Sequence, residues 1–557
     1  MRTLIFICLL FNVVLLKAVT RYVDTKGNDN NSGTLSQPFK TLRKAVNSSN
    51  DGDVIEMRNG TYTSDEIKIE INNLTIRSYP GEWAKIEAPV DKGEAIAAVL
   101  WYSDPNTVGG LLERIEIVGG AFYGLFFDSN WNWGLPVNQR SGVSGISIKG
   151  CKIHDTGRDC IKITPGCNDI QIIDCEIYNS GVGPENLPVN GGPNAEGIDN
   201  VNGARMIVRN CYFHDISTNG LYAKGGSKGS IIENNLIRNV GDAGIGIGFY
   251  TDGEWFDPVS NPKYYESIQT IVRNNFIINS GGAGLLFCGA YQCEAYNNTV
   301  ITSSPKYHSP LTFLSGEVGV DDQLTVYPIS KDIKCFNNIF IDQSPTNDDE
   351  HILLLRENAL EGTNLINYNI YFKSNGSSCT FDDNGWPALQ FSSWKTKYGY
   401  DNNSLETNPN LNNNLHLTQS SKAINAGKAT FVNMLDYDGE NRTSTIDIGA
   451  DEFANGAELT IPPPNGTIGT GNKNGTTSSI DINQSINLLI YPNPTSDIIE
   501  IQAVEPIKQV VLYSTDGKLI RKSESKTNVS LQGLIDGVYI LVVELPNSTS
   551  NHIIVKQ

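Results

Sequence analysis

Six side chains that could act as acids, bases or cation ligands occur in three short and similar segments, RDCIKIT, AEGIDNV and TNGLYAK. They are Asp159, Lys162, Glu196, Asp199, Tyr222 and Lys224. Carboxylates of Asp and Glu bind hard divalent cations such as calcium. A lysine amine or a tyrosine phenol can take up or supply a proton once its surroundings have adjusted its pKa. These residue types therefore suit acid–base chemistry beside a bound cation, provided that the fold brings them together.

An internal repeat supplies the elements that must position these side chains. Seven segments, from ISIKGCKIHD to IKCFNNIFID, share an alternating apolar strand, a Cys or Asn, and a second short strand. Aligning the segments places one residue of each in a single column: Cys151, Cys175, Cys211, Asn235, Asn275, Asn298 and Asn338. The shortest spacings in this column are 23 and 24 residues, and the longer ones contain insertions. Because the repeat shows no helical periodicity, it predicts a solenoid of stacked short strands.

The Cys and Asn column predicts how the solenoid is held together. Stacked strands lie about 4.8 Å apart, so each Asn amide can hydrogen-bond to the Asn of the next coil instead of being buried without a partner. Cysteines continue the column as small buried side chains. Nine cysteines remain once Cys8 leaves with the N-terminal segment, and an odd number requires at least one free thiol. We expect reduced, stacked thiols with no catalytic role.

Composition divides the chain into four segments. Residues 1–20 contain Arg2, a short apolar run and small residues at the end, as is typical of a signal peptide. Residues 21–453 hold the repeats, with a short helix expected over 38–46 to cover the open end of the solenoid. Residues 454–487 are rich in Pro, Gly, Thr and Asn and predict a flexible linker. Residues 488–557 alternate short strands with Pro-Asn-Pro and Asp-Gly turns, which predicts a small β-sandwich.

Two parts of the chain resemble known families. The phrase GDVIEMRNGTY resembles the first coil of extracellular right-handed parallel β-helix proteins, which include polysaccharide lyases and some glycoside hydrolases. NPNLNNNLHLTQSSKAINAG and DYDGENRTSTIDIGADEF look like the closing coils of the same group. The resemblance implies an all-β chain, with a right-handed parallel β-helix followed by the sandwich.

The C-terminal phrases LLIYPNPTSDIIEIQ and SLQGLIDGVYILVVE resemble the sorting domain of the type IX secretion system of Bacteroidetes. This implies export through the periplasm to the medium or the cell surface, with the secretion machinery as a partner. A carbohydrate-binding module is the alternative, but the segment shows no aromatic platform for a sugar.

Placing the repeats in register also aligns a second set of strands. If Leu125, Ile161, Ile198 and Leu221 point inward, their neighbours point outward by the two-residue alternation of a strand. Three outward columns follow: Asp159, Glu196 and Asn219; Phe126, Lys162, Asp199 and Tyr222; Asp128, Thr164 and Lys224. The six ionisable side chains then share one face within about two rungs, or 10 Å. A polar face turned to water is the plain alternative.

Long loops flank the same coils and predict the walls of a sugar-binding groove. They cover residues 130–143, 179–194 and 250–266, and a further loop carries His308. From these loops and the neighbouring columns we expect substrate contacts by Asp128, Trp131, Trp133, Asn219, Trp255, Tyr264 and His308.

The resemblance also suggests a reaction, because several β-helix polysaccharide lyases use a lysine base with calcium held by acidic residues. We expect cleavage of an anionic, uronic-acid polysaccharide, such as alginate or pectate, by β-elimination. A base takes the C5 proton, the glycosidic oxygen leaves C4, and a cation neutralises the carboxylate. Lys224 is the expected base, Tyr222 the proton donor or second base, and Lys162 the carboxylate clamp. Calcium ligands are expected from Asp159, Glu196 and Asp199.

Three other functions remain open at the level of sequence. Asp159 and Glu196, one rung apart, suit a retaining glycoside hydrolase. A uronate C5-epimerase shares the proton abstraction, and a non-catalytic glycan-binding surface protein shares the groove.

Charge and hydropathy exclude further classes. The net charge of −19 and the lack of a basic stretch disfavour nucleic-acid binding. No segment after the first twenty residues is apolar for long enough to cross a bilayer, and we expect a monomer.

His154 and His214 occupy the same repeat position, which favours a structural role. The acidic residues Asp436, Asp438, Asp447, Asp451 and Glu452 could hold calcium, but a terminal turn motif is the favoured interpretation.

Overall fold

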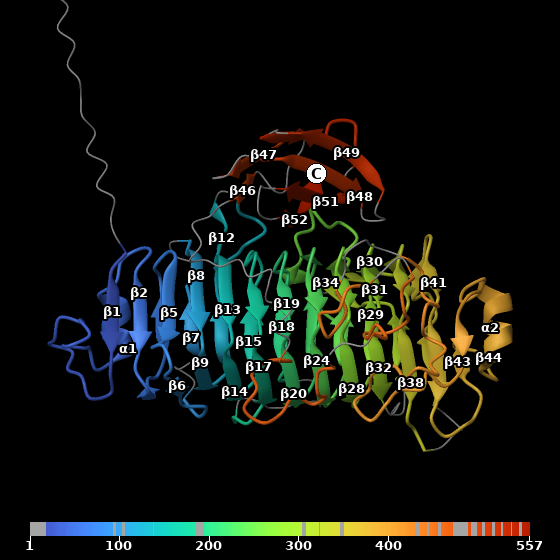
Figure 1. The fold of residues 1–557 in the computed structure, drawn as a ribbon, viewed down its shortest axis with the longest axis horizontal. Coiled ribbons are helices and arrows are strands. Elements are labelled where there is room, and N and C mark those ends of the chain that lie inside the picture. The colour runs from blue at the N-terminus through green and yellow to red at the C-terminus, as the bar shows by residue number, and fades with distance from the viewer. Residues whose placement is uncertain are drawn as a thin grey trace, which may run out of the picture.

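In the computed structural model the chain forms a long parallel β-helix and a small separate β-domain (Figure 1). The structure describes these residues: 18–92, 96–102, 106–136, 139–184, 194–302, 308–321, 324–345, 350–429, 435–442, 445–454, 458–471, 488–491, 498–503, 507–514, 518–524, 527–535, 537–544 and 549–556. Most of the predicted signal peptide lies outside them, and Thr20 begins the first strand. Within them, no helix is both long and apolar enough to span a bilayer.

Three sheets of twelve strands each form the sides of the β-helix, and each coil contributes one strand to each sheet in turn. Sheet 1 contains β1 Thr20–Val23, β2 Val54–Met57, β5 Leu74–Ser78, β8 Val108–Glu113, β13 Ser144–Lys149, β16 Gln171–Ile173, β19 Ile207–Arg209, β23 Ile231–Glu233, β27 Ile271–Arg273, β31 Glu294–Tyr296, β37 Lys334–Phe336 and β41 Leu365–Asn367. Sheet 2 contains β3 Gly60–Thr63, β6 Ala84–Ala88, β9 Ile115–Gly119, β14 Lys152–Thr156, β17 Glu176–Ser180, β20 Tyr212–Ile216, β24 Leu236–Val240, β28 Phe276–Ser280, β32 Thr299–Thr302, β38 Ile339–Asp342, β42 Ile370–Lys373 and β45 Leu405–Glu406.

Sheet 3 contains β4 Ile67–Ile69, β7 Ala97–Trp101, β10 Tyr123–Phe127, β15 Ile161–Ile163, β18 Ile198–Val201, β21 Leu221–Lys224, β25 Ile245–Ile247, β29 Leu285–Cys288, β33 Leu311–Leu314, β39 Leu353–Leu355, β43 Thr380–Asp382 and β44 Leu389–Gln390. A short fourth sheet contains β22 Ser227–Lys228, β26 Ser267–Ile268, β30 Ala290–Tyr291, β36 Ser330–Lys331 and β40 Leu360–Glu361. Two hairpins, β11 Ser129–Asn130 with β12 Ser141–Gly142 and β34 Val318–Asp321 with β35 Leu324–Val326, project from the coils. The predicted β-helix is therefore confirmed.

The small domain contains two antiparallel sheets around one core. One sheet contains β46 Leu488–Tyr491, β47 Ile498–Ala503 and β50 Asn528–Ser530. The other contains β48 Gln509–Ser514, β49 Leu519–Glu524, β51 Gly537–Glu544 and β52 Thr549–Lys556. Ile499, Leu512, Val529 and Leu541, from both sheets, are buried in a shared core, as the predicted β-sandwich requires.

The predicted column of Cys and Asn lies at the turn between sheets 1 and 2. Each Asn amide donates to the Asn of the next coil, at 3.0 Å from Asn235 to Asn275 and 2.9 Å from Asn275 to Asn298. The ladder continues through Asn338 and extends to Asn369. Nine cysteines are free and buried, including the three in the column. The expectation of stacked thiols and laddered amides is thus confirmed.

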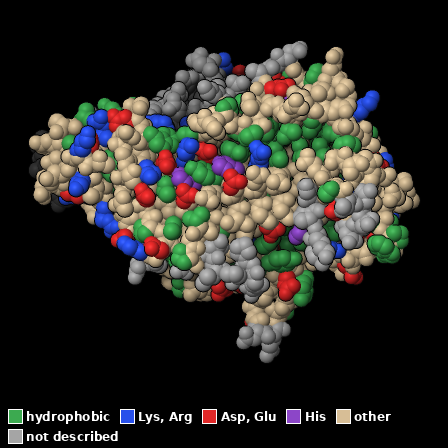
Figure 2. All heavy atoms as spheres, turned by 90° about the horizontal axis from the view of Figure 1, so that it is seen from below, with side chains coloured by type: hydrophobic (Ala, Val, Ile, Leu, Met, Phe, Trp, Pro, Cys, Tyr) green, Lys and Arg blue, Asp and Glu red, His purple; other side chains and the backbone are tan. Residues whose placement is uncertain are grey.

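The repeat also explains two histidines. His154 of β14 and His214 of β20 stack on either side of Tyr178 of β17, with ring centroids 4.4 and 4.7 Å apart. Figure 2 shows the face seen from below, where histidines gather with acidic and basic side chains. Both imidazoles bind the carboxylate of the next residue in sequence. Their shared position is structural, as the sequence predicted.

The N-terminal end of the solenoid is covered by a helix that is shorter than expected. Helix α1, Leu42–Asn47, begins after Thr41, whose hydroxyl accepts the Lys44 amide hydrogen bond. Pro38 and Phe39 remain extended, and Phe39 pairs with Val23 of β1. The chain from Pro38 to Lys40 is therefore held by strand pairing and cannot start the helix.

The segment expected to form closing coils takes a different path. Helix α2, Phe391–Tyr398, covers the C-terminal end, where its buried Trp394 stacks on Phe381 at 5.3 Å. The described residues of 408–471, here named the return strip, then run back along the outside of sheet 2. Asn337 and Asn297, which precede ladder residues, donate to the carbonyls of Lys428 and Asp447. The resemblance of this segment to closing coils did not predict that it lies beside earlier coils.

The acidic residues of the return strip mostly cap backbone groups, as the turn-motif interpretation predicted. Asp436 accepts from the amides of Asp438, Glu440 and Glu452, and Asp447 accepts from those of Asn425 and Phe453. Part of the predicted linker belongs to the same strip, because Thr470 donates to the carbonyl of Asn210. Residues 472–487 lie outside the described ranges.

We predict that Asn298→Ala destabilises the β-helix by about 2–4 kcal/mol, because buried partners lose their hydrogen bonds. Asn298 accepts from the backbone and side chain of Asn275 and donates to Asn338 and Val272. Denaturant unfolding measures the change, with the exposed Asn413→Ala as the control. Equal stabilities of the two variants would contradict a stabilising role of the Asn ladder.

Candidate functional site

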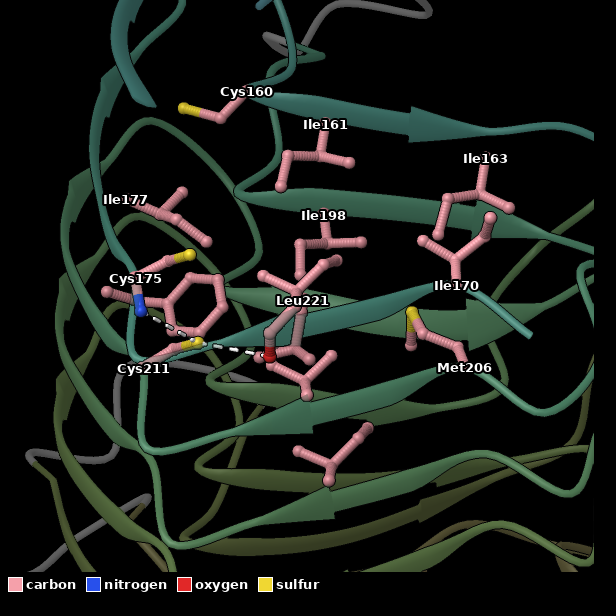
Figure 3. Close-up of a cluster of buried hydrophobic side chains, with 14 of the residues drawn as sticks. Cys160, Ile161, Ile163, Ile170, Cys175, Ile177, Ile198, Met206, Cys211 and Leu221 are labelled. Atoms are coloured by element: carbon pink, nitrogen blue, oxygen red, sulfur yellow. Dashed lines mark hydrogen bonds between the residues drawn. The ribbon is translucent and has the colours of Figure 1, made fainter. Parts of the chain in front are cut away.

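The predicted register of sheet 3 is confirmed strand by strand. Leu125 pairs with Ile161, Ile161 with Ile198, and Ile198 with Leu221. Figure 3 shows Ile161, Ile198 and Leu221 from neighbouring strands pointing into the same interior. One position further, Phe126, Lys162, Asp199 and Tyr222 align on the outer side of the sheet. The wall on which the ionisable side chains were predicted therefore exists.

Three carboxylates from adjacent coils meet on this wall. One oxygen each from Asp159, Glu196 and Asp199 lies within 4.8 Å of the others. Asp159 accepts the backbone N–H of Glu196 at 3.0 Å, and Glu196 accepts from Thr218 at 3.0 Å and from Asn219 at 3.3 Å. Asn219 was expected to contact substrate. In the structure its amide holds the Glu196 carboxylate in place.

The carboxylates are buried, which the sequence did not predict. Asp159, Glu196 and Asp199 are 1%, 4% and 5% exposed. They lie outside the coil, but Lys162 and the Trp255 loop stand beside them, with the Lys162 amine 5.8 Å from the Trp255 ring centre. Strand alternation gives the direction of a side chain, and it does not reveal a loop that covers it.

Crowding of like charges makes this cluster electrostatically incomplete. Burial raises the pKa of Asp159 well above its usual range, and the nearby Glu196 and Asp199 charges raise it further. Oδ1 of Asp199 is buried and makes no hydrogen bond of normal geometry with a described residue. Oxygen donors of this kind suit a hard divalent cation.

Lys162 is bound to the cluster by an ion pair with Asp199. Burial alone would lower the pKa of Lys162, but the Asp199 charge outweighs it and the net shift is upward. Burial would likewise raise the pKa of Asp199, and the Lys162 ammonium turns the net shift downward. The ion pair with Asp199 therefore keeps Lys162 protonated.

Lys224 has a different environment at the end of β21. Its amine lies 4.3 Å from the centre of the Tyr222 ring and donates to the Tyr250 carbonyl at 3.4 Å. It makes no ion pair with a described residue. Tyr222 is 1% exposed, and burial together with the Asp199 charge raises its pKa well above 10. A neutral phenol and an unpaired amine thus lie side by side.

Three tryptophans join two of the flanking loops. The Trp131 ring lies 5.8 Å from Trp133 and 4.8 Å from Trp255, centroid to centroid. Trp133 donates to the Glu254 carbonyl at 3.0 Å. Trp255 ends the 3-10 helix η2, Gly253–Trp255. All three rings are half-buried against one another, so they form a wall beside Lys162.

Other predicted contact residues lie away from the carboxylates. Burial raises the pKa of Asp128, and its charged neighbour is Lys68 of an earlier coil. Tyr264 packs edge-on against Phe256 of its own loop at 5.5 Å. His308 precedes β33, which lies four strands along sheet 3 from β18. Within the loop of 179–194, residues 185–193 are outside the described ranges.

Two residues of the site were missed by sequence reasoning. Tyr123 lies one rung before Asp159, and burial, opposed by Lys162, raises its pKa to about 12. Its segment, FYGLFFD, was already aligned, so extending the Asp159 column by one coil would have found it. Glu266 is fully buried, and its Oε2 accepts from the amide of Gly225, next to Lys224, at 2.8 Å. Burial raises the Glu266 pKa to about 8. No repeat signal marks Glu266, because it ends a loop insertion.

Comparison with known protein families gives one match in each of the two domains. Residues 134–321 match the family described as right handed beta helix region, and residues 489–557 match the secretion system C-terminal sorting domain. No curated protein gives a significant match to the chain.

Solved structures with a similar fold include several carbohydrate-active enzymes. Pectate lyase Pel9A is 15% identical with a TM-score of 0.46, over 78% of this chain and 96% of that one. A glycoside hydrolase is 11% identical with a TM-score of 0.39, over 63% and 96%. Alginate lyase from Paenibacillus sp. str. FPU-7 is 14% identical with a TM-score of 0.35, over 62% and 99%. At these values the likenesses carry no argument about the reaction.

The two family matches agree with the geometry described above. Residues 134–321 span the coils that carry the carboxylates, both lysines and Tyr222, and the C-terminal match covers the β-sandwich. The chain therefore combines a right-handed β-helix region with a type IX sorting domain, and it is exported to the medium or the cell surface.

Proposed function

We propose that the β-helix is a polysaccharide lyase that cleaves a uronic-acid polysaccharide, of the alginate or pectate kind, by β-elimination. The observation that carries this proposal is the different pairing of two lysines on one wall. Lys162 is bound to Asp199 as a buried cation, whereas Lys224 is unpaired with any described acid and adjoins a neutral phenol. A base and a proton donor are thus side by side next to a carboxylate cluster. We expect the enzyme to act as a monomer.

In this mechanism the Lys224 amine, in its neutral form, takes the proton at C5 of the uronate. The electron pair of that C–H bond forms the C4–C5 double bond, and the C4–O bond breaks. Tyr222 donates its phenolic proton to the departing glycosidic oxygen, and its raised pKa keeps the phenol protonated until then. The three-tryptophan wall, with Trp255 beside Lys162, supports the sugar rings.

The carboxylate cluster fits a calcium ion as the cofactor. Three carboxylates and one ammonium leave two negative charges among buried groups, which a divalent cation balances. Asp159, Glu196 and Asp199 would hold it. When bound, the ion would neutralise the substrate carboxylate and so favour charge at C5.

One observation favours a glycoside hydrolase as the second candidate. Asp159 has a raised pKa and accepts a hydrogen bond from the backbone of Glu196, and two neighbouring carboxyl groups of this kind are the pattern of a general acid and its partner. Under this alternative Asp159 protonates the glycosidic oxygen, and the lysines only bind substrate. The two candidates differ in their products, because only elimination leaves an unsaturated sugar end.

We predict that Lys224→Ala lowers the rate of unsaturated-product formation by about 10²–10⁴-fold, because the general base is removed. The assay follows the ultraviolet absorbance of unsaturated uronate over a panel of alginate, pectate and other polyuronates. Lys228→Ala, four residues later in the same coil and on the fourth sheet, is the matched control and should retain activity.

A hydrolase would release reducing ends without that absorbance, and an epimerase would leave chain length unchanged. Either result, or full activity of Lys224→Ala, would contradict the proposed lyase.

We predict that calcium raises the Tm of the wild type but not that of Asp159→Asn, because one ligand charge is lost. At a calcium concentration 100 times the Kd, the stabilisation is about 2.7 kcal/mol. In chelator the wild type should lose stability as pH rises above the ordinary Asp pKa of 3.8, because the folded-state pKa of Asp159 is raised. The amide variant should lack this loss, since it resembles the protonated acid.

Thermal unfolding with calcium or chelator, at several pH values, measures both effects, and Glu357→Gln, at an exposed carboxylate of a later coil, serves as the control. Equal calcium responses in the wild type and Asp159→Asn would remove the cluster as the calcium site.

A further inference from the structure

A second group of potential metal ligands lies in the return strip, far from the wall of sheet 3. Ligand atoms of His416, Asp438 and Asp451 all lie within 4.8 Å of one another. The three residues are 0%, 5% and 5% exposed. They lie well apart along the strip, at positions 416, 438 and 451.

Hydrogen bonds orient each member so that one atom remains for the shared space. The Nδ1–H of His416 donates to the Asn414 carbonyl at 2.7 Å, which leaves Nε2 as the free ring nitrogen. Asp438 uses Oδ1 to accept the amide of Leu459 at 2.9 Å. Asp451 uses Oδ2 to accept the amide of Leu417 at 2.7 Å. Backbone groups outside the cluster thus anchor all three side chains.

The contact between His416 and Asp438 requires a positive charge between them. Nε2 lies 2.8 Å from Oδ2 of Asp438, and it makes no hydrogen bond of standard geometry with a described residue. Two lone pairs at this distance repel each other. Either a proton or a metal ion must therefore lie between the two atoms.

We propose that His416, Asp438 and Asp451 bind one divalent transition-metal ion, with zinc as the natural probe. One imidazole nitrogen with two carboxylate oxygens is a donor set of zinc and similar ions, whereas calcium prefers oxygen alone. Two carboxylates and a neutral imidazole carry two negative charges, which one such ion balances.

The ion would fasten the return strip to the β-helix. Its ligands come from three stretches of the strip, and His416 packs on Phe276 of β28 at 6.0 Å between ring centroids. Phe276 also meets Tyr437, beside Asp438, edge-on at 4.7 Å. A bound metal therefore links chain segments that have few regular strands of their own, as structural metals do in small domains.

The test uses the full chain, freed of metal with a chelator and then titrated with Zn²⁺ alone in a calorimeter. The wild type should bind one equivalent more than His416→Gln, and its Tm should rise with Zn²⁺. Asp159→Asn, altered only in the carboxylate cluster of sheet 3, should keep this equivalent and this Tm rise. Failure of the proposed lyase would leave these outcomes unchanged, because no activity is measured.

Asp451→Asn is the second variant, since it keeps the side-chain shape and the bond to Leu417 even if His416→Gln fails to fold. It too should lose the equivalent. Visible absorption of the Co²⁺-loaded wild type should show nitrogen and oxygen ligands, and Asp451→Asn should lack that spectrum. The proposal would be overturned if the wild type and Asp451→Asn bound the same number of Zn²⁺ ions, or if Zn²⁺ did not change the Tm of the wild type. His416 and Asp438 would then be a buried imidazolium–carboxylate pair.

Discussion

Coil-to-coil register is the constraint on which the rest of the structure depends. Parallel strands stack with residues of the same type above one another, and buried Asn amides penalise any slip because each must find its partner in the next coil. A shift of one residue would turn an entire outward column into the core. The ladder fixes the register of the later coils. Strand pairing carries that register to the column of Lys162, Asp199 and Tyr222, whose own coils have Cys175 and Cys211 in place of Asn.

This rigidity allows the wall of sheet 3 to hold groups that repel each other. Three carboxylates remain close together because their strands are paired in register, and Lys162 compensates only part of their charge. A buried, uncompensated charge costs free energy unless it changes protonation or binds a cation. The raised pKa of Asp159 is the sign of that cost. Such stored electrostatic strain is typical of functional sites.

Much of the fold and half of the site could be predicted from the sequence because both follow from repetition. The Cys and Asn column gave the period, and the alternation of side chains then gave the outward columns that pair Lys162 with Asp199 and Asp199 with Tyr222. What lies between repeats could not be predicted in this way. The return strip, the cover over the carboxylates and Glu266 all belong to insertions or terminal segments, whose position is set by tertiary contacts rather than by period.

The sequence also does not reveal how differently the two lysines of this wall are surrounded. Lys162 is paired with an acid one rung away, whereas Lys224, which lies in the next outward column, contacts a phenol ring and a backbone carbonyl. The central claim is that a uronate binds over this wall with its C5 facing Lys224. A crystal structure of Lys224→Ala with a bound uronate oligosaccharide tests it most directly. The account predicts a sugar C5 directed at the vacated amine position beside Tyr222, and a sugar bound on another face of the β-helix would contradict it.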